Sequence, residues 1–366
     1  MGGVSLNIDS NVALGPVVGI NPSLQSEQRE TPAIIRDFQL IAPDQGWILQ
    51  GGKFLWKNPG DNPWTDLTSP DQTALAAYFL NPDTGWIASP SQTGDSAGTL
   101  DIFSTPDQGQ TWQPAGTLPA AFPDGTGGIW LHFVNEQTGW AAIQLPSGSN
   151  FSLGQLFRTT NGGQTWEEQS LPIGAPVYFV DAQTGWTAGG PAGDELYVTH
   201  DGGETWSGLE LTAETSFRPG PALYALPTFV DGTGVMPVTL AGDDSRVAFF
   251  VSHDNGQTWQ PADEIPIPVA HSLDTSLPIS IVDADTWLIA NPETGALLTT
   301  RDTTKTTTPL DAAPLQIQFA TPDAGWALTF SATCTGTKGA PDFQCAVQTG
   351  LWKTENGGES WTRITP

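Results

Sequence analysis

Residues 179–206, FVDAQTGWTAGGPAGDELYVTHDGGETW, contain the two sequence phrases on which the fold depends. The first phrase is an aromatic residue, a short polar turn and Gly185-Trp186. The second phrase, residues 199–206, has the form Ser/Thr-x-Asp/Asn-x-Gly-x-Thr/Ser-Trp. The two phrases alternate strictly from residue 38 to residue 361, and self-similarity at a fixed spacing is the signature of a repeat protein.

The first phrase, called here the Gly-Trp phrase, occurs seven times if two worn copies are counted. The clear copies run from Phe38 to Gly46-Trp47, Phe79 to Gly85-Trp86, Phe133 to Gly139-Trp140, Phe179 to Gly185-Trp186 and Phe319 to Gly325-Trp326. The worn copies are residues 229–235, FVDGTGV, and residues 281–287, IVDADTW. The mean period is about 47 residues, which lies in the range of repeat architectures.

The second phrase is clean in five copies and eroded at residues 57–64 and 300–306. An Asp or Asn with a nearby Gly supplies the turn and the positive φ that a tight hairpin needs. Each clean copy has an Asp or Asn, a Gly and a closing Trp: Asp107, Gly109 and Trp112; Asn161, Gly163 and Trp166; Asp201, Gly203 and Trp206; Asp254, Gly256 and Trp259; Asn356, Gly358 and Trp361.

Short apolar runs bounded by Gly, Asp, Asn and Pro divide each repeat into four strands. A single four-stranded unit cannot bury its tryptophans on both sides, whereas seven units in a closed ring can. The sequence therefore predicts an all-β fold, a seven-bladed β-propeller of four-stranded antiparallel blades over residues 33–366. We expect the last unit to supply its own fourth strand. We expect residues 1–32 to form an extended arm, packed on the ring or partly mobile, in which residues 17–20 are the most ordered piece.

The second phrase resembles the Asp-box (BNR) motif of sialidases, sortilin-type receptors and xyloglucanase-type glycosidases. Together with the Gly-Trp phrase, the chain is most similar to the photosystem II stability and assembly factor family, whose members are single seven-bladed propellers of this size. The resemblance covers residues 33–365. It implies a propeller that binds another protein beside a membrane complex, and it carries no implication of catalysis, because the Asp box lies on turns away from the usual ligand face.

The charge of the chain limits its partners. There are 39 acidic and 12 basic residues, giving a net charge of −27. Affinity for nucleic acid and anionic lipid comes mainly from Lys and Arg, so we expect neither as a partner. No stretch is long and apolar enough for a spanning helix. Basic protein surfaces, cations and neutral glycans remain as partners, or the charge serves only solubility.

The two cysteines, Cys334 and Cys345, lie in one insertion of the last repeat. Their spacing fits no Cys-x-x-Cys redox or zinc pattern. We expect a disulfide that pins this loop, with two free thiols as the alternative. A disulfide implies an exported protein, in the periplasm, a lumen or at the cell surface. No signal peptide is visible in the first residues, so we expect either a cytosolic protein or a form from which the signal has been removed.

Residues that could bind a ligand are scattered. Sialidase chemistry needs an Arg cluster, and only Arg218 and Arg246 fall near the face formed by the long loops. The histidines show no metal-ligand spacing, and no nucleophile elbow or phosphate-binding loop occurs, so we expect no metal and no cofactor. The residues selected as candidates for ligand or partner binding are Trp130, His132, Arg218, Tyr224, Arg246 and His271.

Two hypotheses of function follow. The first is a non-enzymatic, exported, monomeric propeller that acts as a protein-binding scaffold or assembly factor. The second is a secreted carbohydrate-active propeller, a glycoside hydrolase or a lectin-like protein, that binds sugars through exposed aromatic side chains such as Trp130 and Tyr224.

Overall fold

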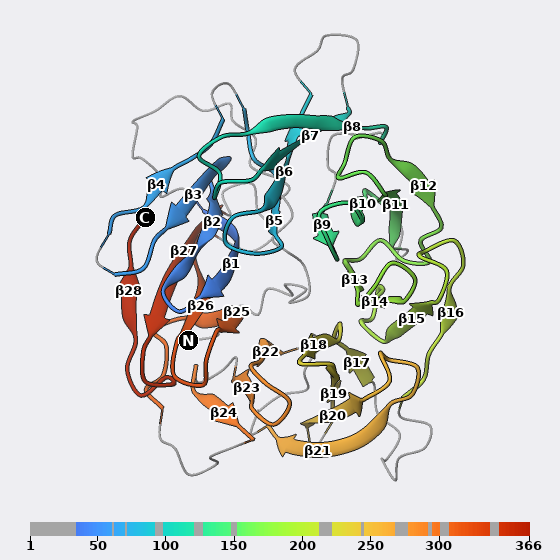
Figure 1. Cartoon of the computed structure of the whole chain (residues 1–366). Coiled ribbons are helices and arrows are strands. Elements are labelled where there is room, and N and C mark those ends of the chain that lie inside the picture. Colours follow the sequence, from blue (N-terminus) through green and yellow to red (C-terminus); the bar gives the residue numbers. More distant parts are fainter. Residues whose placement is uncertain are drawn as a thin grey trace.

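The computed structural model describes residues 34–60, 62–69, 72–91, 98–120, 127–147, 152–211, 222–242, 245–267, 277–291, 295–300, 307–336 and 344–366. Within these ranges the chain forms strands and no helix, and the strands make seven antiparallel sheets. Figure 1 shows the sheets as blades around a central axis, with the first strand of each blade innermost and the last outermost. The chain is therefore a seven-bladed β-propeller. The predicted arm, residues 1–32, lies outside the described residues.

Blades 1 to 4 each have four strands in sequential order. Blade 1 contains β1 (Ile35–Ala42), β2 (Gln45–Gln50), β3 (Lys53–Lys57) and β4 (Thr65–Asp66). Blade 2 contains β5 (Ala76–Phe79), β6 (Gly85–Pro90), β7 (Leu100–Thr105) and β8 (Gln113–Leu118). Blade 3 contains β9 (Ile129–Phe133), β10 (Gly139–Leu145), β11 (Leu153–Thr159) and β12 (Glu167–Gln169). Blade 4 contains β13 (Val177–Phe179), β14 (Gly185–Gly189), β15 (Glu195–Thr199) and β16 (Ser207–Gly208).

The inner strand of blade 5 is divided, and only part of blade 6 lies within the described residues. Pro227 has no N–H to donate and divides the inner strand of blade 5 into two pieces, so this sheet has five strands. They are β17 (Ala222–Tyr224), β18 (Thr228–Val230), β19 (Thr233–Leu240), β20 (Arg246–Ser252) and β21 (Gln260–Pro266). Blade 6 has three strands within the described residues, β22 (Ile279–Ile281), β23 (Trp287–Ala290) and β24 (Leu297–Thr299).

Blade 7 has four strands and supplies its own outer strand. They are β25 (Ala313–Phe319), β26 (Gly325–Thr335), β27 (Gln344–Thr354) and β28 (Thr362–Ile364). Blade 7 meets blade 1 through side chains. Gln318 accepts a hydrogen bond from the backbone N–H of Leu40 (2.7 Å) and donates one to the carbonyl of Phe38 (3.2 Å). The backbone N–H of Ile35 donates to Thr349 Oγ1 (2.9 Å). These contacts close the ring.

The Gly-Trp phrase has a steric cause. In blade 4, Phe179 pairs directly with Gly185 across the first hairpin. A Cβ at Gly185 would lie 2.4 Å from the Phe179 ring, so only glycine lets the ring lie flat over the neighbouring strand. The same closeness recurs at Gly139, where a Cβ would lie 2.3 Å from the ring of Phe133.

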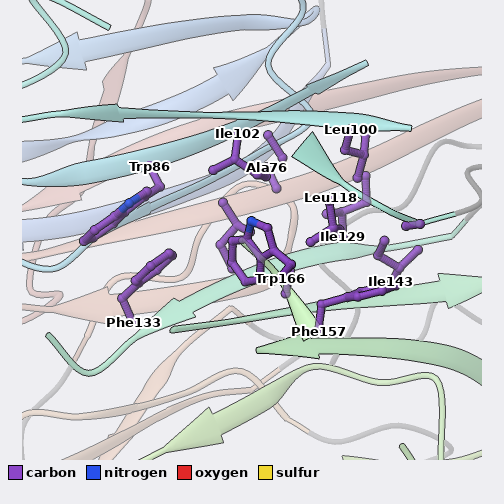
Figure 2. Close-up of a cluster of buried hydrophobic side chains, with 14 residues drawn as sticks. Ala76, Trp86, Leu100, Ile102, Leu118, Ile129, Phe133, Ile143, Phe157 and Trp166 are labelled. Carbon is purple, nitrogen blue, oxygen red and sulfur yellow. The ribbon is translucent and has the colours of Figure 1, made fainter. Parts of the chain in front are cut away.

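The tryptophan of the Gly-Trp phrase packs against the next blade. Trp86 stacks on Phe133 of blade 3 with ring centroids 3.7 Å apart, and Figure 2 shows the two rings parallel. Trp166, which closes the Asp box of blade 3, meets Phe133 edge-on at 6.2 Å. The Trp86 indole N–H donates to the carbonyl of Gly162 in the same turn (3.1 Å). Each repeat therefore buries its aromatic side chains between two sheets rather than within one.

The Asp-box turn is held by a fixed set of hydrogen bonds. In blade 4, Thr199 Oγ1 donates to Asp201 Oδ1 (2.8 Å) and accepts from the backbone N–H of Gly203 (3.0 Å), whose φ is +103°. Thr205 donates its backbone N–H to the same carboxylate (2.9 Å). Partial desolvation raises the pKa of Asp201, but the hydrogen bonds from Thr205 and Thr199 outweigh it and lower the value to about 2. Equivalent hydrogen bonds occur at Asp107, Asn161, Asp254 and Asn356.

The eroded Asp box of blade 1 is stabilised by an ammonium group instead. Lys57 takes the place of the first Ser/Thr, and its side chain is buried. Its Nζ donates to the carbonyls of Asn58 and Gly60 and lies 3.7 Å from Asp44. The eroded copy at residues 300–306 lies outside the described residues except for Thr300.

Two copies of the Gly-Trp phrase are aligned differently in the structure than the sequence suggests. In blade 1, Leu40 rather than Phe38 pairs with Gly46. In blade 6, Ile281 pairs with Trp287, so Trp287 occupies the register of the glycine and Leu288 that of the tryptophan. Since a shift by one residue moves a side chain to the other face of a strand, Trp287 packs toward blade 5, at 4.3 Å from Phe249.

Candidate functional site

The inner strands are linked around the axis by one recurring position, called here the bridging position. In each blade, one inner-strand residue pairs with the Gly of the Gly-Trp phrase, or with the residue that takes the place of this Gly. The bridging position is the residue that precedes this inner-strand residue in the sequence. Its occupants are Gln39, Tyr78, His132, Tyr178, Thr228, Ser280 and Gln318. The Tyr78 hydroxyl donates to the carbonyl of Phe133 in the next blade (2.9 Å), and Ser280 Oγ accepts from the backbone N–H of Phe319 (2.9 Å). These side chains hold neighbouring blades together.

His132, predicted as a candidate ligand-binding residue, is one of these bridges. Its Nε2 lies 2.8 Å from the carbonyl of Phe179, which can only accept, so Nε2 carries the proton. Burial lowers the pKa of His132 to about 4, although the hydrogen bond to Phe179 acts in the opposite direction. The imidazole is therefore neutral at pH 7 and serves the packing of blades 3 and 4.

The inner strands enclose a cavity of about 460 Å³ along the axis of the ring. Every blade contributes to its wall, including Ala77, Leu131, Pro176, Leu226, Ile279 and Leu315. Most wall residues are aliphatic, proline or aromatic. Arg36 and Asp37, both half-buried in β1, are the charged exceptions among the described residues that line it. The cavity, called here the channel, is thus a concave site to which every blade contributes.

Arg36 and Asp37 are placed on the channel by an irregularity in β1. The register of β1 against β2 shifts between Ile35 and Asp37, so that Arg36 has no partner residue opposite it. Such a bulge redirects side chains. Asp37 Oδ1 accepts a hydrogen bond from the backbone N–H of Phe38 (2.8 Å). Desolvation raises the pKa of Asp37 to about 7, against the lowering effect of that hydrogen bond.

The other predicted site residues do not converge. Trp130 lines the channel, but its ring lies against Gly128, where a Cβ would meet it at 2.1 Å. Tyr224 is 5% exposed in the core between blades 4 and 5, so the expectation of an exposed aromatic surface there was wrong. Arg246 forms an ion pair with Glu264 (Nε–Oε2 3.2 Å) across β20 and β21. Arg218 and His271 lie outside the described residues.

Asp37 was not selected from the sequence, although a signal existed. Arg36-Asp37 is the one pair of charged residues within the inner strands described, which otherwise contain apolar, amide, hydroxyl and imidazole side chains. Inner strands face packed neighbours, where lone charges are rare. A charged pair in such a strand is therefore a departure that sequence inspection can find.

Cys334 and Cys345 form a disulfide in the structure. They are directly opposite each other in a long ribbon made by β26 and β27. Within the ribbon, β25 pairs with β26 as far as Phe330, and β28 pairs with β27 from Leu351 onward. The disulfide thus closes a segment that stands clear of the rest of its sheet.

In the described residues, no group of three or more His, Cys, Asp or Glu side chains is arranged to hold a metal ion. The same part of the chain has no helix of the length and hydrophobicity that a bilayer crossing requires.

Comparison with known proteins identifies Asp-box repeats in the chain. A model of the BNR/Asp-box repeat matches residues 197–207 and 250–261, which include two of the turns described above. The protein is thus a propeller built of BNR/Asp-box repeats.

Its curated relative is the photosystem II stability/assembly factor HCF136, chloroplastic, of Oryza sativa subsp. japonica, to which the chain is 28% identical over 115 residues. The match covers 29% of this chain and 25% of that protein, so it spans about a quarter of the relative.

Two solved structures are similar in fold. YCF48 from Cyanidioschyzon merolae is 17% identical with a TM-score of 0.46, over 83% of this chain and 88% of that chain. The GH74 xyloglucanase from Xanthomonas campestris is 13% identical with a TM-score of 0.44, over 97% of this chain and 46% of that chain. At these identities the resemblance concerns the fold alone.

Proposed function

We propose that this protein is a non-enzymatic scaffold that binds a partner protein during the assembly of a larger complex. The observation that carries the proposal is the sequence similarity to a photosystem II stability/assembly factor, on a chain that contains BNR/Asp-box repeats. Of the candidate binding residues, His132 is a structural bridge and Arg246 is paired with Glu264.

The partner we infer is a protein with a basic surface. A net charge of −27 attracts positively charged surfaces over long range and repels nucleic acid and anionic lipid. Such attraction is screened by salt, since the Debye length falls from about 10 Å at 0.1 M to about 3 Å at 1 M.

We also propose that the protein works in an oxidising compartment outside the cytosol. The Cys334–Cys345 disulfide supports this, because disulfides persist mainly in exported proteins. Mass spectrometry of the non-reduced protein from its native host tests it. The expected mass is lower than that of the dithiol by two hydrogen atoms, and a mass equal to that of the dithiol contradicts the proposal.

The function is tested by purifying the tagged full chain from its native host at low and at high salt, followed by quantitative proteomics. We expect one protein complex to be enriched over a tag-only control, and less so at high salt. A glycan array and a panel of fluorogenic glycosides form the second arm. Glycan binding or turnover without an enriched protein partner would replace the scaffold by a carbohydrate-active propeller.

The structure favours the scaffold over the carbohydrate-active alternative at one point. Sugar-binding surfaces need accessible aromatic faces. Tyr224 is buried, and the ring of Trp130 is covered on one side by Gly128. Neither of the two aromatic residues that the sequence suggested for sugars is freely exposed.

A further inference from the structure

The channel wall carries two opposite charges next to each other. Among the described residues, Arg36 and Asp37 take part in no ion pair, with each other or with a third residue. Asp37 has one hydrogen bond, from the backbone N–H of Phe38, and it goes to Oδ1. Both side chains are half-buried, and both line the same cavity. A guanidinium and a carboxyl that could pair but stay apart are available to a ligand.

The rest of the wall is suited to an apolar body. It consists largely of aliphatic and proline side chains from blades 2 to 7, such as Leu131, Pro176 and Leu277. The cavity volume of about 460 Å³ falls within the range of small-molecule sites, which are mostly apolar with a few polar groups that fix orientation. The channel has this composition, with its charged groups confined to one short stretch of β1.

We propose that the channel binds an apolar α-amino acid, with its ammonium group at Asp37, its carboxylate at Arg36 and its side chain along the apolar wall. The two charges of an α-amino acid are a few ångströms apart, and the two charged side chains that line the cavity come from consecutive residues of β1. A plain amine would leave Arg36 beside a second positive charge, and a plain carboxylic acid would leave Asp37 beside a second negative charge. This inference goes beyond the scaffold function and does not depend on it.

The proposal includes a dependence on pH. Because burial raises the pKa of Asp37 to about 7, the carboxyl is charged above that pH and largely neutral at pH 5. Arg36 is the other charged group of the described wall and Tyr78 its other titratable one, and burial raises the pKa of Tyr78 further above its usual value. The amino acid should therefore bind more tightly at pH 8 than at pH 5.

Isothermal titration calorimetry on the full chain tests the site with three probes of matched shape: L-phenylalanine, phenethylamine and 3-phenylpropanoate. At pH 8 we expect L-phenylalanine to bind about ten-fold more tightly than either analogue, since each charge-assisted contact contributes on that order. Asp37→Asn should remove the advantage over 3-phenylpropanoate, and Arg36→Gln the advantage over phenethylamine. Asp101→Asn, on an exposed carboxylate that accepts from Thr117, is the matched control.

Two results would overturn the site. One is absence of L-phenylalanine binding to the wild-type chain. The other is that the wild-type chain binds the three probes with equal affinity, or that the Asp37→Asn and Asp101→Asn variants bind L-phenylalanine with equal affinity. Circular dichroism melting of each variant checks that the ring is intact, and Arg36→Lys, which keeps the charge, retains part of the advantage if the contact is electrostatic. None of these results bears on the protein partner.

Discussion

The junction between blades 3 and 4 and the junction between blades 5 and 6 are built differently from the same repeat. In the first, Trp140 stacks on Phe179 with centroids 3.6 Å apart, and its indole N–H donates to the carbonyl of Gly202 (2.9 Å). In the second, Val235 replaces the tryptophan and Ile281 replaces the phenylalanine. Trp287 fills this junction instead, from the opposite blade, at 4.3 Å from Phe249.

This difference shows which part of the repeat the ring requires. Both junctions bury a large aromatic side chain between two sheets, but only the first takes it from the expected position. The second also lacks a polar bridge: among the described residues no hydrogen bond runs from Thr228 to blade 6, whereas His132 bridges blades 3 and 4. Both junctions therefore bury apolar area between two sheets, but only the junction of blades 3 and 4 does so with the residues of the Gly-Trp phrase in their expected positions.

The largest expected effect comes from removing the stacked tryptophan. Trp140 is fully buried, and Trp140→Ala removes its apolar contacts and leaves its cavity, so we expect a loss of about 3–5 kcal/mol in the free energy of unfolding. Val235→Ala, at the equivalent position of blade 5, removes two methyl groups and should cost about 2 kcal/mol or less. Urea denaturation followed by circular dichroism measures both. Equal losses would mean that the two junctions do not differ as described.

The second effect depends on pH and concerns the bridges. His132 has a pKa of about 4 in the folded chain and an ordinary value near 6.5 when unfolded, so the unfolded chain takes up the proton first on acidification. Stability should fall between pH 6.5 and pH 4, by up to about 3 kcal/mol.

His132→Gln provides the comparison, because Gln39 donates to a backbone carbonyl of the next blade in the same way. Relative to wild type, the variant should lose less stability between pH 7 and pH 4. Ser280→Ala, which removes a bridge that does not titrate, is the control and should run parallel to wild type. If His132→Gln loses as much stability as wild type between pH 7 and pH 4, protonation of His132 is not the cause of the loss.

A smaller effect is expected from filling the glycine register. Gly139→Ala places a Cβ 2.3 Å from the Phe133 ring and should cost about 1–3 kcal/mol through overpacking. Gly208→Ala is the matched control, since nothing lies within 4 Å of a Cβ there, and it should change stability by less than about 0.5 kcal/mol. Blade 6 tolerates Trp287 in this register because its partner is Ile281 rather than a flat ring. If Gly139→Ala leaves the free energy of unfolding unchanged, the Phe133 ring can move away from the added Cβ without cost.

The smallest effect is expected outside the ring. Replacing Cys334 and Cys345 together by serine frees the ribbon, whose outer part pairs with neither β25 nor β28. The ribbon can then open without unfolding the blades, so the free energy of unfolding should change by less than about 1 kcal/mol. A loss near 3 kcal/mol, as expected for a loop that unfolds with the whole domain, would place the ribbon within the cooperative unit of both junctions.

The fold could be predicted because the repeat has a local physical cause. The glycine of the Gly-Trp phrase makes room for an aromatic ring, and the Asp-box turn satisfies its own backbone groups, so both leave clear marks in the sequence. Blade 6 was aligned wrongly because its copy of the phrase lacks the glycine, and Trp287 pairs with Ile281 as Gly185 pairs with Phe179. Pro227 marked the divided strand of blade 5, but composition does not say whether a proline ends a strand or interrupts it.

The channel was harder to predict than the ring. Trp130 was selected as an exposed aromatic side chain and His132 as a candidate ligand-binding residue. In the structure His132 bridges blades 3 and 4, and Trp130 lines the channel but also packs against the core between these blades. The charged pair Arg36-Asp37 can be read from the sequence, but the position of both side chains on the channel wall depends on the bulge opposite Leu49 and Gln50. Local patterns predict strands; a bulge depends on how two strands pair.

The closure of the ring has a consequence for its fluctuations. Each blade is made of consecutive residues, so blades 1 and 7 meet without a connecting loop between their adjoining strands, and side chains form the seam. The amides of Ile35 and Leu40 donate to Thr349 and Gln318 rather than to a neighbouring strand. Any transient parting of the seam exposes these two amides to solvent before a single sheet is disturbed, and hydrogen–deuterium exchange would detect that breathing as early labelling of β1.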